Sequence, residues 1–327
     1  MAKSGLYLNV RGNVDAMGEL VLPGSLSMFG QEESIRQSDG SGRLELALSL
    51  LSPEHPLTSR VYVNRVWHWI FGTGIVASPD DFGRLGDKPS HPELLDWLAR
   101  DFINKRWSTK SLIRELVLSQ SFRQSGMVES NAVQRDPSNR LLHHYPTRRL
   151  EAEQIRDALL AVSGRLDPKL YGRPILPFRN VEDGSKRLYS GPVDGNGRRS
   201  VYLMMSIMDP PKFLTTFDLP DLKMPNGRRN VTSVPTQALL LLNDPLVDQL
   251  SKHWAAELQK VSHRDPGERI DAMVVAAFGR LPKDSERARL QGLLKAVGTE
   301  SDPMMDQAAW AQLAHVIFNT KEFIHTK

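Results

Sequence analysis

Three polar residues, Arg60, Asn64 and His68, recur at intervals of four, so we expect them along one face of a helix. The charged residues that accompany this row in the sequence are Arg65, Asp80 and Asp81. Such a group could bind an anion or form a His–Asp pair for general-base catalysis. A polar seam, in which the arginines pair with loop carboxylates, explains the same spacing, so both interpretations stay open.

A second group, Arg149, Glu153 and Asp157, has the same interval of four, and Arg156 follows Glu153 by three residues. Two carboxylates on one helical face could serve as an acid/base pair or as metal ligands. Both arginines lie within one helical turn of Glu153, so a charge-balanced ladder is the alternative.

A third group, residues 227–237, is a polar run (GRRNVTSVPTQ) that enters an apolar helix. We expect Thr232 or Ser233 to cap this helix. Arg229 and Gln237 would then lie near free backbone N–H groups that attract a sulfate, carboxylate or phosphate. Every capped helix has this potential, so an ordinary helix start is the alternative.

These groups define the candidate site residues. The candidate catalytic residues are His68, Asp81, Glu153 and Asp157, and the candidate ligand-binding residues are Arg60, Asn64, Arg65, Arg149, Arg229 and Gln237. The His91-Pro92-Glu93 motif is similar to one half of a zinc deaminase site, but the other half needs cysteines. His143 and His144 are adjacent, which on a helix turns their side chains about 100° apart. We therefore expect no metal and no cofactor in this chain.

The composition of the 327 residues excludes several other classes of site. There is no cysteine, which excludes disulfides, thiolate catalysis, cysteine-ligated zinc, iron–sulfur clusters and covalent c-type haem attachment within the chain. Lys and Arg number 42 against 38 Asp and Glu, too small an excess to predict nucleic-acid binding. No apolar run approaches the roughly 18 residues of a membrane span, and the first residues lack a signal-peptide core.

Hydrophobic periodicity predicts a mainly α fold, a multi-helix orthogonal bundle with a small β element and a Gly/Pro-rich middle loop. Short strands are expected within residues 5–24 and 199–205, and a loop at 25–41. The helices are expected at 43–51, 58–71, 91–102, 108–122, 149–166, 209–217, 235–242 and 245–261, with three more before residue 319. Ser90 and Glu93 form a capping-box pattern, and Trp67 and Trp97 are expected to be buried.

The expected organisation has four parts. Residues 1–41 hold short strands and a loop, 42–166 an N-terminal helical part, 167–205 a Gly/Pro-rich connection and strand, and 206–327 a C-terminal helical part packed with the first. Helices must bury their apolar faces against one another, so we expect the three polar groups to be drawn together into one polar centre.

Several of these segments also carry a family resemblance. Residues 55–67 (HPLTSRVYVNRVW), 148–157 (RRLEAEQIRD) and 229–239 (RNVTSVPTQAL) look like the planctomycete PSD domain, known as domain of unknown function fifteen fifty-three. Further matching segments are residues 71–76, 81–83, 91–98, 199–203, 217–221 and 319–323. The resemblance covers nearly the whole chain.

The resemblance implies a cellular location and partners for this protein. It implies no reaction, because the family has no established activity or catalytic residue. Members of the family typically form the C-terminal part of large exported proteins, after a cytochrome-c-like domain. They occur in bacteria rich in polysaccharide-degrading enzymes. This implies a periplasmic or cell-surface location, a haem-containing partner and a role in polysaccharide utilisation. Residues 6–24 then resemble the tail of a preceding domain, and we expect a fragment or shortened homologue.

The expected function is a non-catalytic binding or scaffolding module of an exported, cytochrome-linked assembly, with an anionic glycan as a further expected partner. The alternative is an enzyme that acts on carbohydrate or sulfated polysaccharide through the His68 and Asp81 region or through Glu153 and Asp157. A pocket that joins two of the polar groups would favour an enzyme, and dispersed, mutually paired charges would favour a scaffold.

Overall fold

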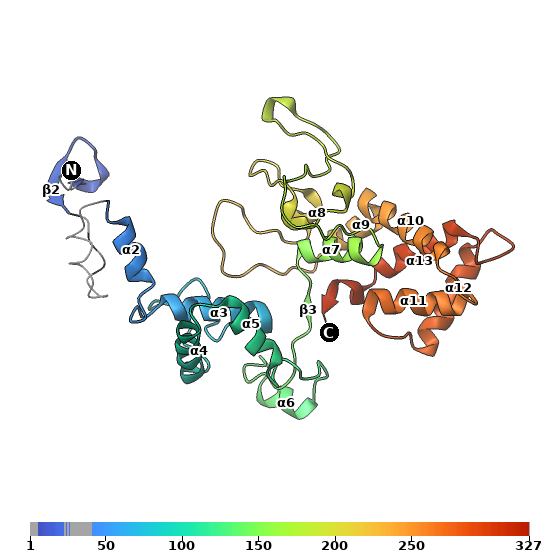
Figure 1. Cartoon of the computed structure of the whole chain (residues 1–327), viewed down its shortest axis with the longest axis horizontal. Helices are drawn as coiled ribbons and strands as arrows, with labels where there is room; N and C mark the ends of the chain where they lie inside the picture. The colour runs from blue at the N-terminus through green and yellow to red at the C-terminus, as the bar shows by residue number, and fades with distance from the viewer. Residues whose placement is uncertain (1–5, 23, 25, 27–40, 327) are drawn as a thin grey trace. The chain divides into compact units, whose positions relative to one another are not determined.

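The computed structural model describes residues 6–22, 24, 26 and 41–326, which belong to two compact units, Met1–Pro146 and Thr147–Lys327. Helices dominate both units (Figure 1). Among the described residues, the strands form two small two-stranded sheets. The expected mainly α fold with a small β element is therefore confirmed.

The first unit begins with an antiparallel hairpin, as the alternating residues predicted, and continues in helices. Its elements are β1 (Leu6–Asn9), η1 (Val10–Gly12), β2 (Met17–Val21), α2 (Arg43–Leu50), α3 (Thr58–Phe71), α4 (Pro92–Asn104), α5 (Thr109–Leu118) and α6 (Ser130–Arg135). In the hairpin, Leu6 lies opposite Val21. Most of the expected loop at 25–41 lies outside the described residues.

The core of the first unit lies among α3, α4 and α5. Its buried members are Val63, Phe71, Ile75, Val76, Leu95, Leu98, Phe102, Leu112 and Leu116. Asn64 of α3 is fully buried beside this core, and its side chain bonds both backbone groups of Val76, at 2.8 Å to the N–H and 3.0 Å to the carbonyl. A Cβ atom at Gly74 would lie 2.4 Å from the Val76 carbonyl oxygen, so glycine is needed for this close approach. The contact fixes the segment that follows α3.

Two expectations for α4 are wrong. Trp97 is 53% exposed, because the buried face of the helix is formed by Leu95, Leu98 and Phe102 and Trp97 points away from it. The Ser90 hydroxyl donates to the Ile75 carbonyl at 3.2 Å, and His91 is the N-cap without a side-chain bond, so no capping box forms.

The second unit contains β3 (Arg148–Arg149), α7 (Ala152–Val162), η3 (Gly184–Lys186), η4 (Gly195–Gly197), η5 (Ser200–Tyr202), α8 (Lys212–Thr216), α9 (Pro235–Asn243), α10 (Pro245–Lys260), α11 (Pro266–Phe278), α12 (Asp284–Val297), α13 (Gln307–Phe318), η6 (Lys321–Ile324) and β4 (His325–Thr326). The expected helices of this region are present, with α7 shorter than predicted. Strands β3 and β4 pair antiparallel, with Arg149 opposite His325.

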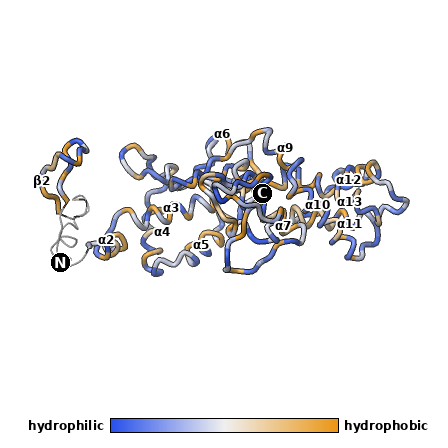
Figure 2. The backbone as a smooth tube through the Cα atoms, turned by 90° about the horizontal axis from the view of Figure 1, so that it is seen from above, coloured by the Kyte–Doolittle hydropathy of each residue, from blue (hydrophilic) through white to orange (hydrophobic). Residues whose placement is uncertain are grey.

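The core of the second unit is built around α10 and α13, which lie side by side in both Figure 1 and Figure 2. Leu250 and Trp254 of α10 and Leu313 of α13 are buried there. Ile155 and Leu159 of α7 join the same core. This packing explains why the units divide after Pro146, whereas the sequence suggested a division after Leu166: the apolar face of α7 packs with the C-terminal helices.

The Gly/Pro-rich stretch belongs to the second unit and contains short 3-10 turns and isolated bridges. The expected strand at 199–205 is wrong, since Ser200–Tyr202 is the 3-10 helix η5 and Leu203 alone bridges to Ile175. The Ser200 N–H bonds the Asp157 carboxylate at 2.7 Å instead of a neighbouring strand.

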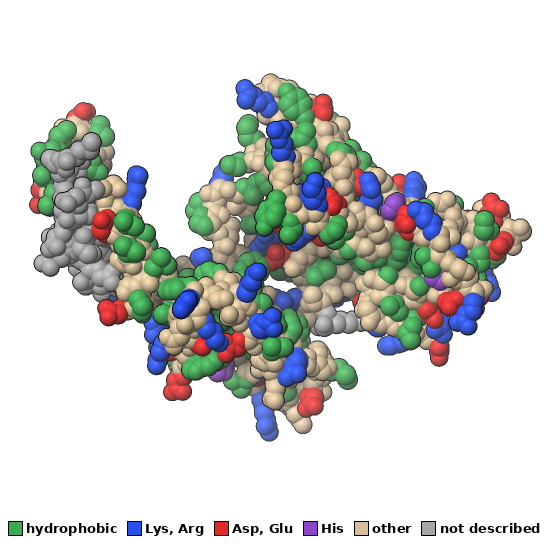
Figure 3. Space-filling view, in the orientation of Figure 1, with side chains coloured by type: hydrophobic (Ala, Val, Ile, Leu, Met, Phe, Trp, Pro, Cys, Tyr) green, Lys and Arg blue, Asp and Glu red, His purple; other side chains and the backbone are tan. Residues whose placement is uncertain are grey.

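No helix in the described part of the chain is long and apolar enough to cross a membrane. In Figure 3, basic and acidic side chains are interspersed over the face of the second unit in view. This mixture agrees with the small net charge of +4. The expectation of no nucleic-acid partner stays a prediction.

Candidate functional site

Helix α7 positions the carboxylates of the candidate site. Its start is a capping box in which Glu151 accepts the Gln154 backbone N–H, while the Glu151 N–H donates to Gln154 Oε1 at 3.0 Å. The apolar residues Ile155 and Leu159 anchor the helix in the core. Glu153 and Asp157, four residues apart, lie on the partly buried flank of the helix.

Arg229 joins the two glutamates at this helix start. Its guanidinium donates to both carboxylate oxygens of Glu153, at 2.5 and 3.0 Å, and lies 3.3 Å from Glu151 Oε2. Burial raises the pKa of Glu151, the Arg229 cation opposes that rise, and the neighbouring Glu153 charge adds to it. Two carboxylates therefore share one arginine, and Glu151 holds a proton more readily than an exposed glutamate does.

Asp157 is held by a second network on the same helix. Its carboxylate accepts both the backbone N–H and the hydroxyl of Ser200, each at 2.7 Å. The Ser200 hydroxyl in turn accepts from Arg156 at 3.2 Å. Arg156 is 4% exposed and also donates to the carbonyls of Arg198 and Asp194, and burial lowers its pKa. Arg199 is 3.8 Å from Asp157, too far for a hydrogen bond.

Arg149 serves a third network, which fixes the segment leading into α9. It donates to Asp218 Oδ2 at 2.7 Å and to the Thr232 carbonyl at 2.8 Å. Thr232 bonds Asp218 through its N–H and its hydroxyl, and Gln237 donates to the Thr216 carbonyl at 3.1 Å. Burial tends to raise the pKa of Asp218, but the bonds from Thr232 and Arg149 outweigh it and lower that pKa.

Carboxylates at the start and on the flank of α7, together with Arg199 and Arg229, line a cavity of about 810 Å³. Its polar wall comprises Glu151, Glu153, Gln154, Asp157, Arg199, Ser200 and Arg229. Its apolar wall comprises Ala158, Ala161, Leu166, Val201, Leu203, Met205, Leu219, Pro220 and Leu222. We call this space the α7 cavity. It can offer a ligand both fixed hydrogen-bond donors and acceptors and apolar surface.

A family model named PSD1 and described as "Protein of unknown function (DUF1553)" matches residues 42–294. The chain belongs to this family. No curated protein and no solved structure matches the chain. The PSD1 match includes the whole polar wall of the α7 cavity and ends within α12. Helix α13 lies beyond the match, yet it supplies Trp310 and Phe318 to the core of the second unit.

Within this PSD1 protein, the structure brings the second and third polar groups together in the second unit. Glu153, Asp157 and Arg229 line one cavity. The predicted ladder on α7 does not form, because the helix begins at Ala152 and Arg149 belongs to β3. Thr232 and Ser233 do not cap α9, whose N-cap is Val234.

The first polar group lies in the first unit and pairs there. Arg60 donates to Asp96 at 2.6 Å, and Arg65 lies 3.6 Å from Asp80. The Asp81 carboxylate accepts the Gly83 N–H at 2.8 Å. His68 is partly buried, with its ring edge-on to Trp69. The Asn64 side chain bonds the backbone of Val76, as described above.

The histidines that the sequence did not favour as metal ligands also lie in the first unit. His91 lines a cavity of about 530 Å³ beside Trp67 and Phe71, and its Nδ1 is 2.9 Å from Ser90 Oγ. His143 and His144 contact each other, with their Nδ1 atoms 3.2 Å apart. Among residues 6–22, 24, 26 and 41–326, no three His, Asp or Glu side chains are grouped closely enough to hold a metal ion.

Sequence reasoning missed Glu151, Ser200 and Asp218 as members of these networks. The Glu151–Gln154 spacing of a capping box could have identified Glu151. Ser200 and Asp218 reach their partners through contacts 43 and 69 residues apart, and no local pattern marks such contacts.

Proposed function

We propose that the second unit is a non-catalytic binding module and that the α7 cavity binds a neutral saccharide. The observation that carries this proposal is the pairing of a fixed polar wall with an apolar wall in one cavity of about 810 Å³. Mostly apolar pockets of about 300–1,000 Å³ with a few placed polar groups are typical of small-molecule sites.

The chemistry of the polar wall suits hydroxyl groups, which donate and accept hydrogen bonds at the same time. Glu153 and Asp157 keep acceptor capacity, because an ionised carboxylate has about four lone-pair sites. The Arg199 side chain is 47% exposed and lies beyond hydrogen-bond distance of Asp157, so its N–H groups can serve as donors. The C–H surface of a sugar ring can contact apolar lining residues such as Val201 and Pro220.

The charge balance of the cavity favours a neutral ligand. Three lining carboxylates, Glu151, Glu153 and Asp157, face two lining arginines, Arg199 and Arg229. The lining has no excess of positive charge, which disfavours the anionic glycan that the sequence suggested for this protein. Each charge already has an opposite neighbour, so the wall is organised before a ligand arrives.

The setting of the module is a further part of the proposal and rests on the family resemblance. In an exported assembly with a haem-containing partner, at the cell surface or in the periplasm, the module would hold a glycan close to that partner. It would contribute binding, and the partner would contribute the redox chemistry.

One observation favours an enzyme as the second candidate. Burial raises the pKa of Glu151, while Glu153 beside it is held by two hydrogen bonds from Arg229. Two neighbouring carboxyl groups in different environments are the arrangement that glycoside hydrolysis uses. Glu151 also caps α7, however, which accounts for its position without catalysis.

The test of the proposed function is a saturation-transfer NMR screen of the full chain with neutral trisaccharides (cellotriose, xylotriose, mannotriose and maltotriose) and a sulfated counterpart. We expect saturable binding of at least one neutral trisaccharide and weaker binding of the sulfated one. No binding by any neutral trisaccharide at millimolar concentration contradicts the proposal.

The same samples separate the binding module from the enzyme. A binding module leaves the trisaccharide intact after prolonged incubation, whereas a hydrolase releases mono- and disaccharides that NMR detects. Glu151→Gln must abolish this release if Glu151 is the acid. The matched control is Glu300→Gln, an exposed glutamate in the second unit outside the cavity.

A further inference from the structure

Two adjacent histidines, His143 and His144, lie in the chain between α6 and β3, and their rings contact each other. The two Nδ1 atoms are 3.2 Å apart. On a helix, neighbouring side chains turn about 100° apart, which disfavours a shared metal ion. The backbone here is not helical, and Leu142, immediately before the pair, has a left-handed conformation with φ of 51°. The two imidazole rings can therefore meet, as they could not on a helix.

Hydrogen bonds hold the backbone of the pair in place. The Asn139 side chain bonds both backbone groups of His144, donating to the carbonyl at 2.9 Å and accepting from the N–H at 3.4 Å. The next residue, Tyr145, donates its N–H to the Ser125 carbonyl at 3.1 Å and its hydroxyl to the Ile70 carbonyl at 3.0 Å. The histidines are thus positioned by the fold, and a ligand would not have to order this segment.

The hydrogen bonds of the His143 ring leave a lone pair on its Nδ1 atom. Its Nε2 atom lies 3.2 Å from the Asp136 carbonyl oxygen, and a carbonyl only accepts, so Nε2 carries the proton and donates. In the neutral ring the Nδ1 lone pair then faces His144, which donates to it from its own Nδ1. A ring that donates its outer N–H to a backbone carbonyl has the orientation typical of histidines that bind metal.

The separation of the two Nδ1 atoms fits two ligands of one transition-metal ion. Imidazole nitrogens that lie about 2.0–2.1 Å from an ion are about 2.9 Å apart at a right angle and about 3.3–3.4 Å apart in a tetrahedron. The observed 3.2 Å lies between these values. Both histidines are partly exposed, so water can complete the coordination of an ion bound there.

We propose that His143 and His144 bind one divalent transition-metal ion through their Nδ1 atoms, with water as the remaining ligands. Copper(II) is the ion bound most tightly, because the affinity of a nitrogen site rises from nickel to copper and falls again at zinc. Magnesium, which prefers oxygen ligands, is not bound. On binding, each Nδ1 gives its lone pair to the ion, and the proton on His144 Nδ1 passes through water to Nε2 of the same ring. This site lies in the first unit and does not depend on the saccharide site.

The test is isothermal titration of the full chain with copper(II), zinc(II) and magnesium chlorides in a buffer that does not bind metals. We expect one equivalent of copper(II) to bind at least about tenfold more tightly than zinc(II), and no saturable binding of magnesium. Electron paramagnetic resonance of the copper(II) complex should show hyperfine coupling to two imidazole nitrogens. The absence of saturable copper(II) binding, or a spectrum without two imidazole ligands, overturns the proposal.

Three variants locate the ion. His143→Asn and His144→Asn each remove one imidazole, and each is expected to weaken copper(II) binding at least about tenfold. His253→Asn, at another partly exposed histidine, is the matched control and should bind as wild type does. Wild-type affinity in either His143→Asn or His144→Asn overturns the shared site, as does an equal loss in His253→Asn. If one of the two variants fails to fold, the other variant and the spectrum of the wild-type complex still decide.

Discussion

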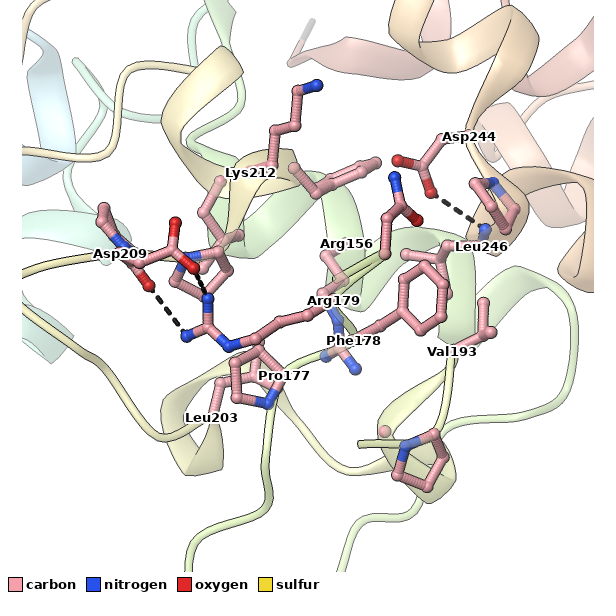
Figure 4. Close-up of a pocket in the computed structure, with 18 of the residues that line it drawn as sticks. Arg156, Pro177, Phe178, Arg179, Val193, Leu203, Asp209, Lys212, Asp244 and Leu246 are labelled. Carbon is pink, nitrogen blue, oxygen red and sulfur yellow. Dashed lines mark hydrogen bonds and ion pairs between the residues drawn. The ribbon is translucent and has the colours of Figure 1, made fainter. Parts of the chain in front are cut away.

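The buried guanidinium of Arg156 donates a hydrogen bond to the Ser200 hydroxyl at 3.2 Å, and these two residues line different cavities of the second unit. Arg156 lines a cavity of about 310 Å³ beside α8 and the start of α10 (Figure 4), whereas Ser200 and its acceptor Asp157 line the α7 cavity. The partition between the two cavities is therefore a polar network on α7 and η5.

Removing the Ser200 hydroxyl should affect both sides of this partition. Ser200→Ala removes a fully buried hydroxyl that accepts from Arg156 and donates to Asp157, although the other bonds of Arg156 and the bond from the residue 200 N–H to Asp157 remain. We expect a loss of about 1–2 kcal/mol in the free energy of unfolding, measured by urea denaturation. Ser301→Ala, at an exposed position, is the control. An unchanged midpoint and slope for Ser200→Ala would show that the network does not stabilise the unit.

In the first unit, Asn64 should be a larger determinant of stability than any of its charged neighbours. Asn64→Ala removes both bonds to the backbone of Val76 and leaves a buried N–H and carbonyl unpaired. The expected loss is about 2–4 kcal/mol, again by urea denaturation. Asn104→Ala, at an exposed position of α4, should change stability little. A loss no greater than that of the control contradicts the role of Asn64.

Acid should weaken the second unit partly through Glu286. Hydrogen bonds from Arg280 and from the Lys283 N–H lower the pKa of Glu286 from 4.5 to about 2. A carboxyl group whose pKa is lower in the folded chain than in the unfolded chain stabilises the folded state at pH values above the unfolded pKa. This stabilisation is lost as the pH falls from 4.5 through about 2.

The matching measurement is urea denaturation of wild type and Glu286→Gln across that pH range. We expect the stability difference between them to be largest above about pH 5 and to shrink towards pH 2. A stability difference that stays constant with pH would exclude Glu286 as a source of the acid sensitivity. Glu300→Gln is the control for a general effect of removing one negative charge.

Glu153→Gln should lower stability and weaken saccharide binding together. The substitution keeps one acceptor for Arg229 but places an amide N–H against a guanidinium that is 23% exposed. We expect a loss of about 1–3 kcal/mol in the free energy of unfolding. A thermal scan in the presence and absence of a bound trisaccharide measures both effects. Unchanged stability with unchanged binding would remove Glu153 from the site.

The sequence predicted the helices well because each has local signals. The spacing of Val63, Val66 and Ile70 and the glycine after Phe71 predicted α3 with both of its ends. The apolar run and Pro235 predicted α9 in the same way. The candidate site was predicted only in part, since Glu153, Asp157 and Arg229 were identified but their partners were not.

The errors arose where a distant contact overrode a local pattern. Arg149 has helical spacing to Glu153, but it pairs with His325 in a two-residue sheet, so α7 begins three residues later. The Ser90 hydroxyl bonds Ile75 instead of capping α4. Residues 199–205 have strand-like composition, yet the Asp157 carboxylate takes the Ser200 N–H, and a 3-10 turn results. Local sequence periodicity does not predict any of these partners.

The central claim, that the α7 cavity binds a neutral saccharide, is tested most directly at Arg199. This side chain lines the cavity and lies beyond hydrogen-bond distance of Asp157, so Arg199→Gln should remove a ligand contact and leave the fold intact. The measurement is isothermal titration of the full chain with the trisaccharide that binds best, in wild type, Arg199→Gln and the control Arg173→Gln. The account predicts saturable binding by wild type and control, at least about tenfold weaker binding by Arg199→Gln, and equal free energies of unfolding for all three. Wild-type affinity in Arg199→Gln would contradict it.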